Sequence, residues 1–178
     1  MRLDGAVLAP KTLAEVMEAT WPPAAYIPCG PFLLRDGAGG GKRVSAATAE
    51  GATVETAFTE ADLARAEATM GDNPLFLIRD GDGDLDAALA ARGYGIVDPV
   101  LAYSASVSAL IGEGAGHMTT FPHWPPMQIA RVLWADAGIG PARLAVMERA
   151  KGAKTVILGR TNDRASGVAF VACHGRHA

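Results

Sequence analysis

The chain has 178 residues, of which 49% are hydrophobic and 20% are charged, and its formal net charge is −3. This composition is typical of a globular protein with a buried core, and no apolar run approaches the ~18 residues that indicate a membrane span. The N-terminus lacks the apolar segment and cleavage site of a signal peptide, and Cys29 and Cys173 are expected to be free thiols. We therefore expect a cytoplasmic protein with no membrane partner.

The charges are unevenly distributed along the chain. Residues 1–123 carry 8 Lys and Arg and 16 Asp and Glu, whereas residues 124–178 carry 8 Lys and Arg and only 3 Asp and Glu. An anionic small molecule would be attracted to the C-terminal part, and nucleic acid would be repelled by the rest. Attraction between the two halves of the chain explains the same pattern equally well. We expect no nucleic-acid partner.

Several short elements are predicted in the first half of the chain. Thr12 to Thr20 reads as a helix opened by a capping box of Thr12 and Glu15, and Phe32 to Arg35 and Arg43 to Thr48 read as strands around a glycine-rich turn. Thr59 to Met70 is the clearest helix, because Thr59 is followed by Asp62 at the third helical position. The next elements predicted are a strand at 75–79, a helix at 85–92 ended by Gly93 and Tyr94, and a strand at 96–106.

The last third of the chain reads as two helices and a hairpin. One helix follows Trp124-Pro125-Pro126 and ends at Gly138-Ile139-Gly140, and a second is opened by Pro141. Trp134 either extends the buried stripe of the first helix or lines a pocket. Strands are predicted from Lys154 to Gly159 and from Gly167 to Cys173. Because both faces of this hairpin are apolar, we expect helices to cover both faces of its sheet.

The sequence contains no motif that by itself assigns a chemistry. The glycine-rich turn before Lys42 lacks the phosphate-loop pattern, because Asp36 stands at the first glycine position and Arg43 where Ser or Thr binds magnesium. Four histidines, at positions 117, 123, 174 and 177, lack the spacing of metal ligands, so no metal is expected. No serine has the context of a catalytic nucleophile. The catalytic residues are therefore not assigned.

The arrangement of two helices and a hairpin over residues 124–177 resembles the opening half of the GNAT acyltransferase fold. Residues 1–110 resemble the family more weakly, through a strand, a helix ending in Ala91-Arg92-Gly93-Tyr94 and a further strand. The resemblance implies an α+β fold with a mixed, largely antiparallel sheet and two partial or degenerate GNAT units. The expected units are residues 1–110 and 124–178, joined by a glycine-rich linker at 111–123.

The same resemblance implies the function. GNAT enzymes transfer an acetyl group from acetyl-CoA to an amine, and they hold the pyrophosphate on a loop of sequence Q/R-x-x-G-x-G/A at a helix N-terminus. We expect no such loop in this chain, so its cofactor-binding residues are not assigned. Trp134 and Arg143, beside the loop from Gly138 to Pro141, are the candidate substrate-binding residues. The partner would be a small-molecule or peptide amine, and the alternative is a non-catalytic GNAT-like binding or structural module.

The final strand predicts an unfinished sheet. Gly167 to Cys173 is apolar on both faces, and such a strand needs neighbours along both edges. Strands from the first unit, a second copy of the chain or native residues beyond Ala178 would satisfy it. We expect the third, because a GNAT domain places its fourth strand there, and we therefore expect this chain alone to be inactive.

Overall fold

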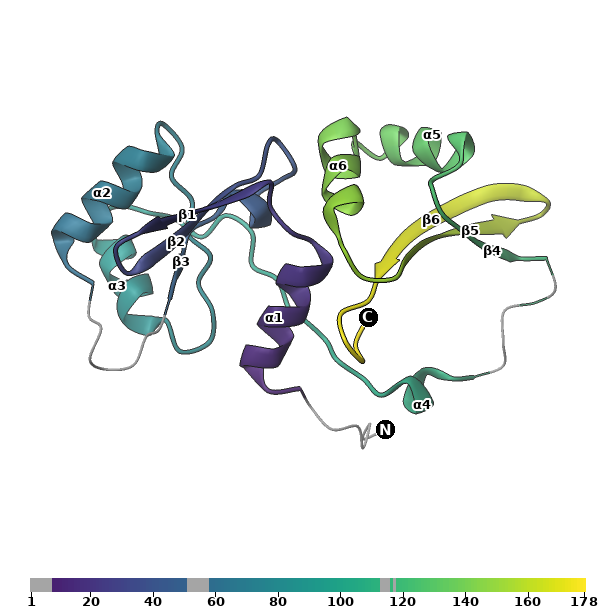
Figure 1. The fold of residues 1–178 in the computed structure, drawn as a ribbon, viewed down its shortest axis with the longest axis horizontal. Helices are drawn as coiled ribbons and strands as arrows, with labels where there is room; N and C mark the ends of the chain where they lie inside the picture. The colour runs from purple at the N-terminus through teal and green to yellow at the C-terminus, as the bar shows by residue number, and fades with distance from the viewer. Residues whose placement is uncertain (1–7, 51–57, 113–115, 117) are drawn as a thin grey trace. The chain divides into compact units, whose positions relative to one another are not determined.

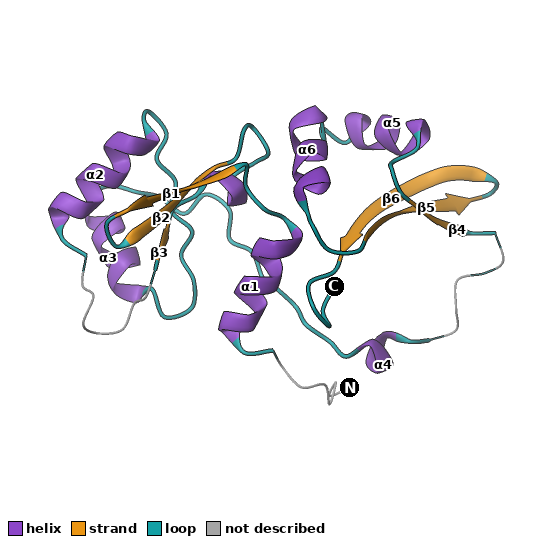
Figure 2. Ribbon diagram, in the orientation of Figure 1, coloured by secondary structure: helices purple, strands orange, loops and turns teal. Residues whose placement is uncertain are grey.

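The computed structural model describes residues 8–50, 58–112, 116 and 118–178. The chain divides into two compact units, one formed by Pro23–Val100 and the other by Met1–Pro22 with Leu101–Ala178. Each unit contains a three-stranded sheet whose strands pair antiparallel, and helices accompany each sheet (Figures 1 and 2). The expected α+β class is therefore confirmed, as two small sheets.

The sheet of the 23–100 unit has the order β1-β2-β3. Its hairpin consists of β1 (Ala25–Cys29) and β2 (Phe32–Asp36), joined by a turn in which Gly30 has a φ of +59°. The expected strand from Arg43 to Thr48 is wrong. Residues Arg43–Ser45 instead form a short 3-10 helix, since Ser45 bonds back to Gly41 and Lys42, and only β3 (Thr48–Ala49) joins the sheet.

Two helices pack beside this sheet. The helix α2 (Glu60–Met70) begins with the predicted capping box, in which Thr59 and Asp62 bond each other's backbone N–H groups. The helix α3 (Gly83–Ala91) begins two residues earlier than expected, and Gly93 takes the left-handed conformation after it, with a φ of +88°. The buried core that joins sheet and helices contains Cys29, Phe32, Leu34, Ala47, Leu63, Ala66, Leu85 and Leu89.

A parallel pairing continues this unit where a strand was predicted at 75–79. Ala47 N–H donates to Leu75 O over 2.8 Å, and Leu77 N–H donates to Ala47 O over 2.9 Å. The result is an isolated parallel bridge between Ala47 and Phe76 rather than a ladder. The chain thus passes from Ala47 and β3 through α2 and returns parallel to residue 47, which is a crossover connection.

The predicted strand from Ile96 to Ser106 is not formed. Residues 95–105 carry no regular structure and are followed by the short helix α4 (Val107–Leu110). The apolar side chains of this segment face solvent, and Ile96, Leu101 and Tyr103 are 83%, 80% and 85% exposed. The alternation of the sequence favoured a strand, but no neighbouring strand is present in the described residues to accept it.

The other unit holds the predicted helices and hairpin. Its elements are β4 (Thr120–His123), α5 (Gln128–Asp136), α6 (Pro141–Arg149), β5 (Lys154–Thr161) and β6 (Arg164–Ala172). The sheet order is β4-β5-β6, and both pairings are antiparallel. Asn162 and Asp163 form the tight turn of the hairpin, with φ values of +51° and +60°. The strand β4 was missed, because Pro122 interrupts a very short apolar run.

Helices cover one face of this sheet, not both as expected. Val156 from β5 joins Ala130, Trp134 and Met147 in the core, and α5 packs against β6 (Figure 1). On the opposite face, Pro122 and Ala169 are exposed. Phe170, in β6, is half-buried.

The first helix of the chain belongs to the same unit as this sheet. The helix α1 (Pro10–Thr20) begins at Pro10, so Thr12 lies inside the helix and the predicted capping box does not form. Trp21 packs edge-on against Phe170, with ring centroids 6.0 Å apart. Arg149 Nε donates to Pro22 O over 3.2 Å.

The two compact units divide the chain at other points than the expected boundaries. Residues 1–22 were expected in a unit that ended at residue 110, whereas they group with residues 101–178. Part of the expected linker, residues 113–115 and 117, lies outside the described residues. Among the helices that the structure describes, none has the length and apolarity needed to cross a membrane.

Candidate functional site

The two predicted substrate-binding residues lie in very different surroundings. Trp134 is 4% exposed and belongs to the core with Ala130, Met147 and Val156, so its first role is packing. Arg143 lies in the first turn of α6 and is exposed. The loop between α5 and α6 separates the two residues along the chain, and Gly138 adopts a φ of +75° there. The structure therefore leaves Arg143 accessible and Trp134 enclosed.

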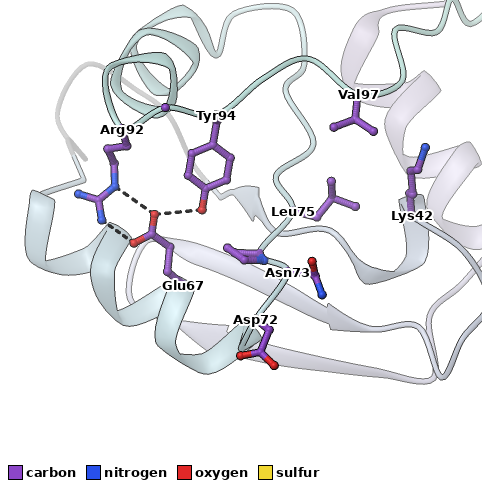
Figure 3. A pocket seen from close by; sticks show the side chains of 10 residues that line it. Lys42, Glu67, Asp72, Asn73, Leu75, Arg92, Tyr94 and Val97 are labelled. Carbon is purple, nitrogen blue, oxygen red and sulfur yellow. Dashed lines mark hydrogen bonds and ion pairs between the residues drawn. The ribbon is translucent and has the colours of Figure 1, made fainter.

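An open pocket of about 700 Å³ lies in the 23–100 unit (Figure 3). Its lining combines charged, polar and apolar side chains from the residue before the 3-10 helix, from α2, and from the segments that follow α2 and α3. The lining residues are Lys42, Glu67, Asp72, Asn73, Pro74, Leu75, Arg92, Gly93, Tyr94 and Val97.

One wall of the pocket is a hydrogen-bonded network around Glu67 (Figure 3). Arg92 binds the Glu67 carboxylate with two donors, Nε at 3.0 Å from Oε1 and NH2 at 2.5 Å from Oε2. The Tyr94 hydroxyl donates to the same Oε1 over 3.0 Å. The remaining Arg92 terminal nitrogen, NH1, reaches Glu60 Oε2 at 2.5 Å. This fork geometry fixes the guanidinium and joins α2 to the end of α3.

The network changes the proton affinities of its members. The hydrogen bonds from Arg92, and then that from Tyr94, hold the pKa of Glu67 below its usual value, although partial burial opposes them. Burial, and then the bond to Glu67, raises the pKa of Tyr94 to about 12. Glu67 is therefore ionised and Tyr94 protonated at neutral pH. The hydrogen bond between them stabilises the ionised carboxylate and the protonated hydroxyl, so neither group is set to transfer a proton near neutral pH.

The other wall of the pocket is more open. Lys42 Nζ lies 3.4 Å from Asp98 Oδ2, and both side chains are more than half exposed. Leu75 and Val97 supply apolar surface between the charged groups, and Asn73 supplies an amide (Figure 3). This arrangement suits binding of a small polar molecule better than catalysis.

The network could not be found by motif search. Glu67 and Arg92 are 25 residues apart on different helices, and their charges have no spacing that distinguishes them from other surface pairs. The sequence signal nearby is the helix end at Gly93-Tyr94, which predicts where the helix stops but not which group binds the Tyr94 hydroxyl. The structure shows Tyr94 packed against the core that contains Leu89, and its N–H donates to Leu89 O.

The expectation that the chain contains no Q/R-x-x-G-x-G/A segment is wrong for the letters, because Arg164, Gly167 and Ala169 match them. These residues lie in β6 and no helix follows them, so the segment does not form a loop at a helix N-terminus. The N-terminus of α2 is capped by Thr59 and carries Glu60 and Asp62 in its first turn. These carboxylates oppose the binding of an anion there.

Two further sources of functional information are a metal site and similarity to known proteins. Within the part of the chain that the structure describes, no three His, Cys, Asp or Glu side chains cluster as metal ligands; His117 lies outside that part. Comparison of the chain with protein-family models, curated proteins and solved structures finds no match.

Proposed function

We propose that this chain is part of a GNAT-like N-acyltransferase and provides the acceptor side of its active site. In the proposed reaction, a neutral amine nitrogen attacks the thioester carbonyl of acetyl-CoA. The new C–N bond forms, the C–S bond breaks, and the amine proton passes to a base while CoA leaves as the thiol or thiolate. The described residues would position the amine.

The proposal rests on the order and packing of the helices and strands within residues 101–178. A strand, two helices and a hairpin follow one another, and the three strands lie in chain order in an antiparallel sheet with the helices on one face. Two helices followed by a hairpin are the part of the chain in which we see the GNAT resemblance. The strand β4, which precedes these two helices, adds one more element to the resemblance.

A second feature of the other unit supports the same scaffold. The chain leaves β3, forms α2 and returns parallel to Ala47 at Phe76. The helix α3 and the Gly93-Tyr94 pair then follow, as the weaker resemblance implies, but the further strand that it also implies is not formed.

The acceptor that this surface would favour is an amine that also carries an anionic group. Arg143 is exposed in the first turn of α6, where the helix dipole adds to its positive charge. No carboxylate lies in this first turn. An amine with a neighbouring carboxylate is attracted to such a position, whereas a polyamine is repelled.

Thiol release from acetyl-CoA tests the proposal. The native polypeptide containing these 178 residues would be incubated with acetyl-CoA and two sets of amines, one with a carboxylate and one without. We expect release with the carboxylate-bearing set and a raised KM, at similar kcat, in Arg143→Ala. Lys151→Ala, which removes an exposed charge after α6, is the matched control. Absence of release with every amine would contradict the proposal.

The alternative is a non-catalytic binding module on the same scaffold. It is favoured by the pocket of the 23–100 unit, where Glu67, Arg92 and Tyr94 satisfy one another and none is left as a free acid or base. A small molecule that binds this pocket without any acetyl transfer, and whose binding is lost in Asn73→Ala, would favour the module.

A further inference from the structure

The open pocket of the 23–100 unit offers apolar surface to a ligand. Its volume of about 700 Å³ lies within the range of small-molecule sites. Pro74, Leu75 and Val97 supply the apolar part of its lining (Figure 3). Val97 is 63% exposed, so much of this surface is in contact with water. A ligand with an apolar part gains free energy by covering it.

Hydrogen bonds hold two sides of the pocket in place. Ala47 N–H donates to Leu75 O over 2.8 Å and Leu77 N–H donates to Ala47 O over 2.9 Å, which fixes the segment after α2. The bonds from Arg92 to Glu67 tie α2 to the end of α3. These walls are therefore formed before a ligand arrives, and binding does not have to order them.

Carboxylates outnumber cations around the pocket. The lining contains two of each, which are Glu67, Asp72, Lys42 and Arg92. A further carboxylate accompanies each cation, because Arg92 NH1 lies 2.5 Å from Glu60 Oε2 and Lys42 Nζ lies 3.4 Å from Asp98 Oδ2. The immediate surroundings of the pocket therefore carry an excess of negative charge.

The charge of the whole unit has the same sign. Residues 23–100 carry 6 Lys and Arg and 12 Asp and Glu. Such an excess attracts small cations to the surface of the unit and repels small anions, an effect that salt reduces. The local and the wider charge thus both favour a positively charged ligand.

The polar groups of the lining include acceptors that an ammonium group can use. Asp72 is exposed, and in the described part of the chain its carboxylate has no hydrogen bond or ion pair. The Tyr94 hydroxyl donates its one proton to Glu67, so its oxygen can only accept from a ligand. Asn73 adds an amide oxygen. The cationic donors, on Lys42 and Arg92, already have carboxylate partners.

We propose that this pocket binds a small organic cation, in which an ammonium group is attached to an apolar body. The ammonium group is held by the free carboxylate of Asp72, and the apolar body covers Leu75 and Val97. Lys42, a like charge in the same lining, opposes the cation. The inference names a ligand class for the binding-module alternative and does not depend on acyl transfer.

Three molecules with the same six-carbon chain test the charge preference. Hexylamine, 1-hexanol and hexanoate would each be titrated into the isotopically labelled 178-residue chain, with amide NMR shifts as the measurement. We expect hexylamine to bind about fivefold more tightly than hexanol, the scale of one exposed ion pair, and hexanoate to bind most weakly. The amides of Asp72, Asn73, Leu75 and Val97 should shift. Equal affinities, shifts only elsewhere, or no shift at about 10 mM hexylamine would overturn the proposal.

Two substitutions of opposite sign test the proposed contacts. Asp72→Asn should weaken hexylamine binding about fivefold and leave hexanol binding unchanged, whereas Lys42→Met should strengthen hexylamine binding. Asp80→Asn, at an exposed carboxylate outside the lining, is the matched control and should change neither. Equal effects of Asp72→Asn and Asp80→Asn, or weaker hexylamine binding in Lys42→Met, would contradict the proposal.

The same titration separates this pocket from the acceptor position proposed above. Arg143→Ala should leave hexylamine binding unchanged, because Arg143 does not belong to the lining. A loss of hexylamine binding in Arg143→Ala would place the cation elsewhere and overturn the inference. Because acetyl-CoA is left out of these titrations, their outcome is independent of the thiol-release experiment.

Discussion

The Tyr94 hydroxyl donates to Glu67 Oε1 over 3.0 Å, and this bond ties the segment after α3 to α2. Tyr94→Phe removes the donor but keeps the ring, which packs edge-on against Phe76 with centroids 5.6 Å apart. We expect a loss of about 1 kcal/mol in the free energy of unfolding, the usual size for one hydrogen bond. Urea denaturation measures it, and Tyr103→Phe, at an 85% exposed side chain, is the control and should change nothing.

The same bond predicts an alkaline limit to stability. Burial raises the pKa of Tyr94 to about 12 in the folded protein, from about 10 in the unfolded chain. A group whose pKa is raised by folding contributes stability in full below its unfolded pKa and loses it as the pH rises through the folded pKa. Stability should therefore fall between pH 10 and 12 more in wild type than in Tyr94→Phe. Titration at 295 nm should show one tyrosine near 12 that the variant lacks.

Glu67 predicts a corresponding loss in acid. The hydrogen bonds from Arg92, first, and from Tyr94 lower the pKa of Glu67, so its contribution is present above the unfolded pKa of about 4.3 and is lost as the pH falls. The difference in unfolding midpoint between wild type and Glu67→Gln should be clear at pH 7 and vanish in strong acid. Glu148→Gln, at an exposed position, should show no such difference; a pH-independent effect of Glu67→Gln would contradict the prediction.

Phe170 should contribute substantially to the stability of the sheet. Its ring lies between Trp21 and Trp124, with centroids 6.0 and 5.9 Å away, but it is only half-buried. We expect Phe170→Ala to cost about 3 kcal/mol, at the low end for deletion of an aromatic side chain. Val132→Ala, at a 42% exposed position on α5, should cost under about 0.5 kcal/mol. Equal losses would show that Phe170 does not pack as described.

Lys154 should stabilise the end of α6. Its ammonium donates to Met147 O, Glu148 O and Ala150 O, and it lies 4.6 Å from the centre of the Trp124 ring. A cation at a helix C-terminus donates to free carbonyl groups and interacts favourably with the negative end of the helix dipole. We expect Lys154→Met to lower the free energy of unfolding by roughly 1–2 kcal/mol. Lys151→Met, at an exposed lysine three residues earlier, should have little effect by the same thermal or urea measurement.

The chain of 178 residues should bind acetyl-CoA poorly by itself. The basic residues 124–178 attract the anion weakly, but no described helix begins at a loop of sequence Q/R-x-x-G-x-G/A, and α2 carries Glu60 and Asp62 in its first turn. Calorimetry should detect only weak binding that falls as salt rises. Micromolar binding that is insensitive to salt would contradict this expectation.

Local signals in the sequence predicted the elements whose cause is local. The capping box at Thr59 and Asp62 is confirmed, as are the left-handed Gly93 and the helix opened by Pro141. In each case a hydrogen bond or a backbone preference acts within four residues. The two strands of the final hairpin were also found, because their apolar runs flank a strong turn sequence.

Features that depend on distant partners were missed or misread. The segment from Ile96 to Ser106 has the composition of a strand but lacks a neighbour in the described residues, so it remains exposed. The pairing of Glu67 with Arg92 and the grouping of α1 with the C-terminal sheet depend on tertiary packing. Trp134 shows the same limit, since its position on a helix did not reveal whether its ring was enclosed by the core or open to a ligand.

The discontinuous unit has a consequence for the order in which the protein is made. Arg149 and Pro22 are 127 residues apart, and Trp21 must wait for Phe170, so α1 leaves the ribosome long before its packing partners exist. Residues 23–100 contain their own core and can fold while synthesis continues. The helix α1 therefore stays without its packing partners during most of synthesis, and the 23–100 unit can form its core in that interval.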